Sequence, residues 1–421
     1  MRYVLLGGVL AVGLAGCGVL NLGKDLQQAK QELQVIEGRV INRAAFNDES
    51  AGTVFAVLLD DAPQPAVVGF RVVAGAEPVR FLSEQAPRQL LAFVDHNGDF
   101  QLDADEPRVW LKQPQRQALG KPAPSAVNEL VITPDALAEA PAVDLKLERL
   151  KAHNPRLKNN YLAQVTLNDA RFDAAITQQG MWQPLQFLRE TGHGLYLLEP
   201  WDPKRVPVLL VHGINDSPRT WAALLPAIDR RQFQVVLYHY PSSWQISSNA
   251  SLLAQAWQDA QLRLGFQRFH LLAHSMGGLL ARDFVRQLSA QQASVMGLCQ
   301  FISLSTPWAG HAAAQQGLEH SPVVAPVWRN LAPNSDFLQA LWRFEWPQQV
   351  PHTLIASYAG DSVFVAGKSD GVVSLASQLH WPAQEQASEI RLIEATHTGV
   401  LTHGQTHAVV RRQLAADCVA R

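Results

Sequence analysis

From about residue 194 onward, short apolar runs alternate with helical patterns, and this alternation restricts the fold more than any other feature. The runs are VPVLLVHG, QFQVVLYHYP, FHLLAHS, LCQFISLSTP and PHTLIASYAG, and each ends in turn residues. Segments with helical spacing, such as SLLAQAWQDAQLRL, lie between them. Strands that are apolar throughout are buried on both faces. We therefore expect an α/β fold, a doubly wound parallel sheet with helices on both sides.

A serine stands where one of these runs meets a helical segment. Residues 270–278 read HLLAHSMGG, with Ser275 between a strand-like run and two glycines. This order predicts a nucleophile elbow, a tight strand–turn–helix that exposes the serine hydroxyl. Such a turn is strained and needs small neighbours two positions away. Gly277 meets that need, whereas Ala273 stands where the commonest motif has glycine.

Candidate acids and bases follow other strand-like runs. A serine hydroxyl needs a base to take its proton, normally a histidine that a carboxylate orients. Residues in the turns after parallel strands can meet, because those turns collect at one edge of the sheet. The chain supplies Asp370 in SDGVV and then His397 in HTGVL. Asp361 is an alternative acid, and His403 and His407 are alternative bases.

Seven motifs together resemble the serine lipase and esterase branch of the α/β-hydrolase family. They are VHGINDSPRTW, YHYPSS, AHSMGG, STPWAG, LAPNSDFLQAL, SDGVV and HTGVL, in family order over about residues 195–415. The resemblance implies that Ser275 attacks an ester carbonyl and that His397 acts as general base and then general acid. Asp370 would orient the imidazole and stabilise its charged form.

The resemblance also implies an oxyanion hole, made by the backbone N–H groups of Ile214 and Met276. His212 and His274 flank this region, and we expect structural roles for both. No cofactor is implied for catalysis. Lipase, phospholipase A, short-chain esterase and thioesterase activities stay open, as does amidase activity with the same triad. A non-catalytic scaffold lipoprotein with a hydrolase fold is the alternative from another class.

The first residues resemble a bacterial export signal. MRYVLLGGVLAVGLAGC has one early basic residue and an apolar stretch too short to span a bilayer as a mature helix. Its end, LAGC, resembles a lipobox, which implies cleavage after residue 16 and acylation of Cys17, for instance with palmitate. An ordinary signal peptide with an incidental cysteine is the alternative. Gly18 does not resemble an inner-membrane retention signal, so we expect anchoring to the outer membrane, facing the periplasm or the surface.

Composition divides the chain into further parts. After a signal peptide at 1–16, residues 17–34 are polar with a helical pattern and fit a tether. Residues 35–145 hold short β-rich runs, among them TVFAVLLD and PAVVGFRVV, that predict a small all-β sandwich-like domain. Residues 146–193 fit a connector and residues 194–421 the catalytic domain. A length of 421 residues agrees with two domains.

One loop of the β-rich region has the spacing of calcium ligands. DHNGDFQLDADE carries oxygen-bearing side chains at the first, third, fifth, ninth and twelfth positions, which resembles an EF-hand loop. These residues are Asp95, Asn97, Asp99, Asp103 and Glu106. Phe100 stands at the sixth position, where glycine is usual, and the flanks fit strands. We expect a calcium-stabilised hairpin loop, with a solvated acidic turn as the alternative.

Charge and composition bear on the remaining partners. The chain has 35 Lys and Arg against 37 Asp and Glu, a net charge of −2 without a long basic block, which argues against nucleic-acid binding. The histidines of the catalytic half lack the paired spacing of a zinc site. Aromatic residues between Pro307 and Pro347 fit either a lid over an acyl pocket or core packing. Cys299 and Cys418 are able to pair in an oxidising compartment, and the sequence leaves this open.

Overall fold

The computed structural model describes residues 4–43, 52–73, 78–118, 127–146, 148–150, 162–290, 297–361, 367–416 and 418. The chain forms two compact units. We call the first the α/β unit; it comprises Met1–Asp25, Asn159–Ser289 and Ser294–Arg421. The second, the β unit, comprises Leu26–Lys158 and Ala290–Ala293. The α/β unit thus takes in residues 159–193, which the sequence pattern assigned to a connector.

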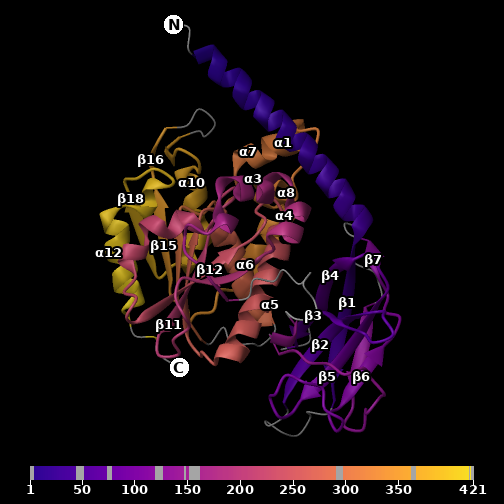
Figure 1. Ribbon diagram of the computed structural model, residues 1–421. Helices are drawn as coiled ribbons and strands as arrows, with labels where there is room; N and C mark the ends of the chain where they lie inside the picture. Colours follow the sequence, from indigo (N-terminus) through magenta and orange to yellow (C-terminus); the bar gives the residue numbers. More distant parts are fainter. Residues whose placement is uncertain are drawn as a thin grey trace. The chain divides into compact units, whose positions relative to one another are not determined.

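The α/β unit is built on a sheet of eight described strands, in the order β18-β15-β14-β13-β11-β12-β10-β9 (Figure 1). Neighbouring strands are parallel, except that β10 runs antiparallel to β12. The strands are β9 (Ala163–Gln164), β10 (Gly194–Leu197), β11 (Val206–Val211), β12 (Phe233–His239), β13 (Phe269–His274), β14 (Leu298–Leu304), β15 (His352–Ser357) and β18 (Glu389–Ile393). The predicted parallel sheet is confirmed.

Helices connect these strands. They are α3 (Ala174–Trp182), α4 (Pro184–Glu190), α5 (Ile246–Leu264), α6 (Met276–Ala290), α7 (Ala312–His320), α8 (Pro326–Leu331), α9 (Asp336–Arg343), α10 (Leu375–Gln378), α11 (Trp381–Gln386) and α12 (Gly404–Leu414). Shorter elements are η1 (Ala170–Phe172), η2 (Pro218–Ala223), η3 (Leu225–Ala227), η5 (Gly399–Leu401), β16 (Ala359–Gly360) and β17 (Ser369–Asp370). Local signals set the ends: α5 stops at Gly265, whose φ of 70° is a left-handed conformation that glycine adopts readily.

The sheet is covered on both faces, as a doubly wound fold requires. On one face, Trp257 of α5 lies 4.8 Å from Phe269 of β13 and 6.5 Å from Phe284 of α6, between ring centroids. On the other face, side chains of η2, η3 and α12 share a core cluster with Leu272. Because side chains alternate along a strand, Phe269 and Leu272 point to opposite faces of β13.

The β unit holds two four-stranded sheets. One has the order β4-β1-β7, with β8 pairing in parallel with β1, and the other has the order β3-β2-β5-β6. The strands are β1 (Leu33–Asn42), β2 (Thr53–Asp60), β3 (Val67–Val72), β4 (Val79–Glu84), β5 (Arg88–Asp95), β6 (Arg108–Leu111), β7 (Gln117–Ala118) and β8 (Asn128–Ile132). Ile36 and Phe81 of one sheet and Leu58 and Leu90 of the other belong to one apolar core. The expected small β domain is therefore present.

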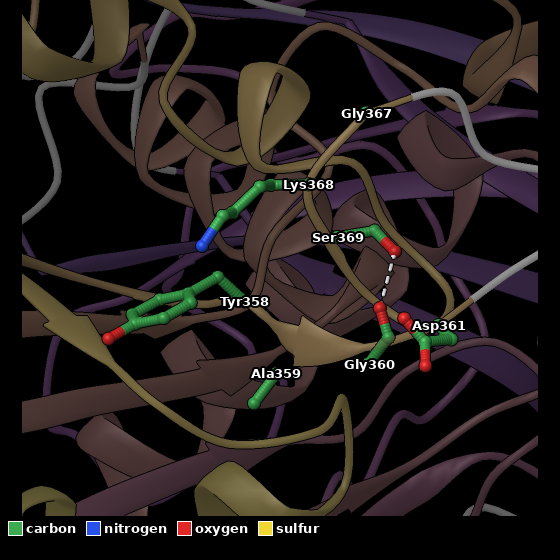
Figure 2. A pocket seen from close by; sticks show the side chains of 7 residues that line it. All are labelled: Tyr358, Ala359, Gly360, Asp361, Gly367, Lys368 and Ser369. Atoms are coloured by element: carbon green, nitrogen blue, oxygen red, sulfur yellow. Dashed lines mark hydrogen bonds between the residues drawn. The ribbon is translucent and has the colours of Figure 1, made fainter.

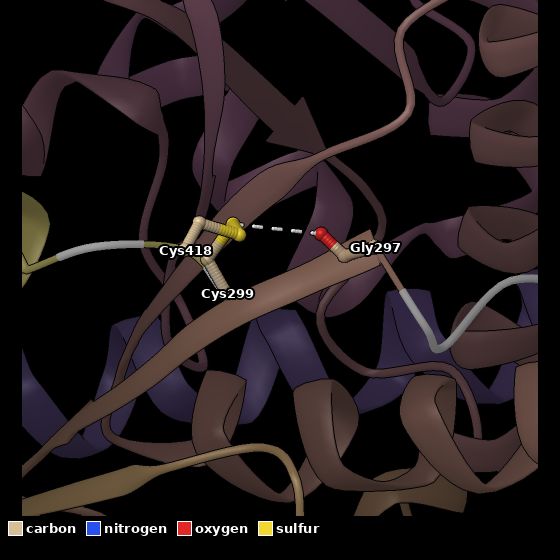
Figure 3. The surroundings of a disulfide bond; sticks show 3 residues. All are labelled: Gly297, Cys299 and Cys418. Atoms are coloured by element: carbon tan, nitrogen blue, oxygen red, sulfur yellow. Dashed lines mark hydrogen bonds between the residues drawn. A yellow bond between two sulfur atoms is a disulfide. The ribbon is translucent and has the colours of Figure 1, made fainter. Parts of the chain in front are cut away.

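A disulfide joins Cys299 of β14 to Cys418, beyond the end of α12 (Figure 3). The two Cα atoms are 4.9 Å apart, although 119 residues separate them in sequence. The pairing that the sequence left open is thus present, and it ties the C-terminal segment to the sheet.

The N-terminal helix α1 (Val4–Glu32) is one continuous element that includes Cys17. It runs through the residues that the sequence pattern assigned to a signal peptide and a tether. In the described ranges, no helix has both the length and the apolar character needed to cross a membrane.

Candidate active site

Ser275 lies at a sharp turn between β13 and α6. Its φ of 56° is a left-handed backbone conformation that residues with a side chain seldom adopt. The turn closes because Gly277 has no side chain: a Cβ there would lie 2.4 Å from the carbonyl oxygen of Val211 and 2.5 Å from that of His212. Ala273 is fully buried in β13, which accommodates its methyl group. The strand–turn–helix is therefore formed with alanine in place of the usual glycine.

Asp370 ends β17, and its carboxylate is surrounded by hydrogen-bond donors. Its Oδ1 accepts hydrogen bonds from the backbone N–H groups of Val372, at 2.9 Å, and Val373, at 2.7 Å. Burial alone would raise the pKa of Asp370, but the hydrogen bond and charge of His397, with the two amides, hold this pKa below its usual value. The buried carboxylate is therefore kept ionised.

His397 lies on the turn after β18 and contacts Asp370 at two points. Its Nδ1 is 2.7 Å from Asp370 Oδ2, and its backbone N–H donates to the Asp370 carbonyl oxygen at 2.8 Å. Because an ionised carboxylate only accepts hydrogen bonds, Nδ1 of the neutral ring carries the proton and Nε2 keeps a lone pair. This tautomer is the one that a general base needs.

His274, the residue before the serine, brings His397 against the elbow. Its Nε2 lies 2.9 Å from the carbonyl oxygen of His397, and the two ring centroids are 4.8 Å apart. Burial lowers the pKa of His274 to about 3, so the ring is neutral and Nε2 is the nitrogen that donates. Residues 123 positions apart are thereby joined beside Ser275.

Ile214 and Met276 place backbone N–H groups at this edge of the sheet. Ile214 lies in the turn after β11, and Met276 is the first residue of α6. Neither N–H has a hydrogen-bond acceptor in the part of the chain that the structure describes. Gly213 lets the two turns approach, because a Cβ there would lie 2.9 Å from the Cβ of Ser275. Unpaired donors at such a place can stabilise negative charge that develops on an oxygen.

His212 is fully buried and holds the turn that leads into Ile214. Its Nε2 lies 3.2 Å from His239 Nδ1, and its ring stacks on Tyr240 with centroids 4.4 Å apart. The Tyr240 hydroxyl donates to the His212 carbonyl oxygen at 2.6 Å. Burial lowers the pKa of His212 to about 4, so these contacts are made by a neutral ring.

The fold and these turns agree with a known protein family. Residues 206–321 match the family model described as the alpha/beta hydrolase fold. The matched segment begins at β11, includes Ser275 and ends just after α7. Over this segment the chain is similar to the α/β-hydrolase family, and the α/β unit has the α/β-hydrolase fold.

Solved structures that are similar to this chain include two lipases and a phospholipase. The mature form of lipase BlEst2 from Bacillus licheniformis is 16% identical, over 52% of this chain and 97% of that one, with a TM-score of 0.43. Lipase B from Aspergillus fumigatus is 19% identical, over 53% and 56% of the two chains, with a TM-score of 0.39. Phospholipase PlaB from Legionella pneumophila is 20% identical, over 41% and 45%, with a TM-score of 0.34. No curated protein matches the sequence of this chain.

The alternative acid and bases are engaged elsewhere or exposed. Asp361 is exposed just after β16. His403 accepts a backbone hydrogen bond at the start of α12, and His407 Nε2 lies 2.9 Å from a carbonyl oxygen in η5. Of these candidates, the structure brings Asp370 and His397 together.

Sequence reasoning missed two side chains that hold Asp370. Its Oδ2 accepts hydrogen bonds from the hydroxyl of Ser357, at 3.0 Å, and from the side-chain amide of Gln378, at 3.1 Å. Ser357 is the last residue of HTLIAS, and a hydroxyl at the end of an apolar strand is a signal that points toward the site. Gln378 lies in the short helix α10, where the local pattern holds no comparable signal.

A cavity of about 500 Å³ lies beside the acid (Figure 2). It is lined by Tyr358, Ala359, Gly360, Asp361, Gly367, Lys368 and Ser369. The Lys368 ammonium lies 5.3 Å from the centre of the Tyr358 ring. One lining residue, Ser369, directly precedes Asp370 in sequence. Ser275 and His397 are not among the lining residues, so the cavity does not reach the serine.

Three aromatic residues after Pro307 pack around a buried arginine: Trp342, Phe344 and Trp346. Arg282 of α6 is 2% exposed, and its guanidinium carbon lies 4.4 Å from the Trp342 ring centre and 5.4 Å from that of Trp346. Burial lowers the pKa of Arg282 to about 9. Trp308 and Trp346 are themselves buried, which favours core packing over a lid for these two rings.

The loop with calcium-ligand spacing lies in the β unit and is closed by hydrogen bonds of its own. The five predicted ligands are Asp95, Asn97, Asp99, Asp103 and Glu106. The Asp95 carboxylate accepts from the N–H groups of Gly98 and Phe100, and that of Glu106 from the N–H of Asp103. Phe100 has a φ of 65°, the conformation that glycine usually supplies at its position. Over the described ranges, no group of three or more His, Cys, Asp or Glu side chains is arranged to hold a metal ion, and the calcium site stays a prediction.

Proposed function

We propose that the chain is a serine carboxylic-ester hydrolase of the lipase or esterase class that works through an acyl-enzyme. One linked set of contacts carries this proposal. Ser275 stands at a strained turn, His274 beside it bonds to His397, and His397 bonds to Asp370. A serine in an ordinary turn needs no buried histidine–carboxylate pair next to it.

In the first half-reaction, Asp370 keeps the imidazole of His397 oriented and stabilises its charged form. His397 Nε2 takes the hydroxyl proton while the Ser275 oxygen attacks the ester carbonyl carbon. The N–H groups of Ile214 and Met276 bind the resulting oxyanion, and one such donor is typically worth about 3 to 4 kcal/mol. The intermediate then expels the alcohol, which leaves with the proton from His397.

In the second half-reaction, water releases the acyl group. His397 takes a proton from the water, whose oxygen attacks the acyl carbon on Ser275. The same amides bind the second oxyanion. The carboxylic acid leaves, and the serine oxygen recovers its proton from His397. Both half-reactions are balanced by this chain's own groups, so the proposed cycle requires no cofactor.

We also propose that the protein is exported and anchored through lipid on Cys17, with the outer membrane as its site. The LAGC sequence, which ends in Cys17, supports this. The disulfide between Cys299 and Cys418 adds support, because such bonds persist in oxidising compartments. The substrate class is an acyl ester or ester lipid, and nucleic acid is not a partner.

The test is hydrolysis of p-nitrophenyl esters of increasing acyl length by the chain that begins at Gly18. We expect Ser275→Ala to lower turnover by about 10⁶-fold, because removing the nucleophile disables the whole triad. Its circular dichroism should match that of the unmodified chain. Hydrolysis of thioesters or anilides instead of esters would move the assignment to a thioesterase or amidase. Equal rates for both chains on every substrate would favour a scaffold protein.

A further inference from the structure

The part of α1 that follows Cys17 is packed onto the α/β unit. Gly18, Leu22 and Asp25 are buried, a spacing of four and three residues that forms one stripe of a helix. Gly18 lies so close to Trp182 of α3 that a Cβ would be 2.9 Å from the indole ring. The first residue after the proposed lipid anchor therefore touches the catalytic unit.

Two further contacts hold this segment in place. The Asp25 carboxylate, on a residue that is 5% exposed, accepts hydrogen bonds from the backbone N–H groups of Leu185, at 2.8 Å, and Gln186, at 3.1 Å. A Cβ on Gly23 would lie 3.0 Å from the Val323 side chain, between α7 and α8. The start of the segment that the sequence pattern assigned to a tether is thus packed against the α/β unit.

The opposite face of the same segment is open. Leu20 is 64% exposed, and Lys24, one turn further on, is also exposed. A leucine near the anchored end followed by a lysine is the order in which a helix meets a bilayer, with the apolar group in the acyl region and the cation among the headgroups.

Hydrogen bonds connect this contact with the oxyanion turn. The Trp182 indole N–H donates to the Gln178 side-chain oxygen at 3.0 Å, and the Gln178 amide donates to the Asn215 side-chain oxygen at 3.0 Å. Asn215 follows Ile214 directly in sequence. Two side-chain hydrogen bonds therefore connect Trp182, which contacts Gly18, to the turn that carries Ile214.

Because consecutive Cα atoms are about 3.8 Å apart, a lipid on Cys17 leaves no slack between the membrane and the docked Gly18. We propose that α1 seats the α/β unit directly on the phospholipid bilayer that holds its own anchor, through the face bearing Leu20. The substrate is then an ester lipid of that same leaflet. This inference rests on the proposed ester hydrolysis and on acylation of Cys17.

The test lengthens the connection between the lipid anchor and helix α1. It uses the full lipidated chain in phosphatidylcholine vesicles. Twenty Gly and Ser residues inserted between Cys17 and Gly18 give a flexible reach of about 25 Å and leave the docked helix intact. We expect hydrolysis of p-nitrophenyl palmitate, which partitions into the bilayer, to fall at least about fivefold. Hydrolysis of water-soluble p-nitrophenyl acetate should not change. Equal palmitate hydrolysis with and without the insertion would overturn the inference.

A second readout does not depend on activity. A fluorophore attached through Leu20→Cys should be quenched by brominated phosphatidylcholine, and the quenching should be lost with the inserted linker. The same fluorophore attached through Leu392→Cys is the matched control, since Leu392 is 51% exposed on the edge strand β18. Equal quenching at both positions, or none at Leu20, would overturn the inference even in a chain that hydrolyses neither ester. Loss of both ester activities with intact quenching at Leu20 would instead overturn the proposed hydrolysis.

Discussion

The two units bury different kinds of side chain. In the α/β unit, five histidines on the sheet strands or directly after them are at most 2% exposed: His212, His239, His270, His274 and His352. The apolar core of the β unit consists of aliphatic residues and phenylalanine. His96, the one histidine of the β unit within the described ranges, is exposed.

The buried histidines of the α/β unit carry a cost in stability. Desolvation disfavours a charged imidazole, so burial lowers the pKa of His212 and His270 to about 4 and that of His274 and His352 to about 3. These rings stay neutral and serve as hydrogen-bond partners, as His274 does for the carbonyl oxygen of His397. The α/β unit gives up some stability to position these rings. The β unit buries no histidine within the described ranges, although Asp95 and Glu106 are at most 2% exposed.

The largest expected effect separates the two candidate acids of the α/β unit. Asp370→Asn should lower turnover by about 10⁴-fold, because an amide at this position favours the wrong imidazole tautomer. Asp361→Asn is the matched control and should change turnover little, since Asp361 is exposed. Steady-state hydrolysis of p-nitrophenyl butyrate measures both. The reverse ranking would show that Asp361 is the acid.

The next effect concerns the β unit. Leu58 is 1% exposed in its core, and Leu58→Ala should destabilise that unit by about 2 to 5 kcal/mol through lost burial and the cavity left behind. Leu137→Ala, at a residue that is 51% exposed, should change stability by less than about 0.5 kcal/mol. Urea denaturation followed by circular dichroism measures both. If Leu58→Ala lowered turnover of the native chain, the β unit would have a part in catalysis.

Acid should affect the units differently. An unfolded histidine binds a proton below a pH of about 6.5, whereas folded His270 does so below about 4. Between these values the unfolded state binds more protons, so the stability of the α/β unit falls as the pH drops. For His270 this shift corresponds to about 3 kcal/mol. Calorimetry from pH 7 to 4 should show a smaller loss for His270→Leu than for the unmodified chain, and equal losses would contradict this account.

The smallest expected effect concerns the loop of the β unit. Calcium at ten times its dissociation constant should stabilise the β unit by about 1.4 kcal/mol if the loop binds it. Asp95→Asn should remove that effect, because Asp95 stands at the first ligand position. Asp105→Asn should leave it intact, because Asp105 is exposed and lies between the predicted ligand positions. Thermal melts with calcium and with a chelator decide the question, and identical melts would favour a solvated acidic turn.

Much of this architecture could be predicted because it is encoded locally. The run FHLLA, the serine and the two glycines fix β13, the turn and α6 within a short stretch of chain. The turns that carry Asp370 and His397 follow from their motifs. Contacts between residues far apart in the chain have no comparable local pattern in the sequence. The Asp25 carboxylate accepts a hydrogen bond from the backbone N–H of Leu185, 160 positions away in sequence. The residues around neither position predict this contact.

The sequence pattern failed in a similar way at the ends of the α/β unit. Residues 163–164 lack the long apolar runs of the central strands, yet they form an edge strand of the sheet. An edge strand of two residues has too few side chains to show a period. The disulfide between Cys299 and Cys418 likewise depends on the three-dimensional fold, because cysteine spacing alone does not state a pairing.

We propose that Ser275 carries the acyl group during turnover. The most direct measurement is mass spectrometry of the protein quenched in acid during hydrolysis of p-nitrophenyl butyrate, followed by peptide mapping. We expect one butyryl group on the peptide that contains Ser275, and none after Ser275→Ala. Turnover with an acyl group on another residue, or with no acylated peptide at any time, would contradict it.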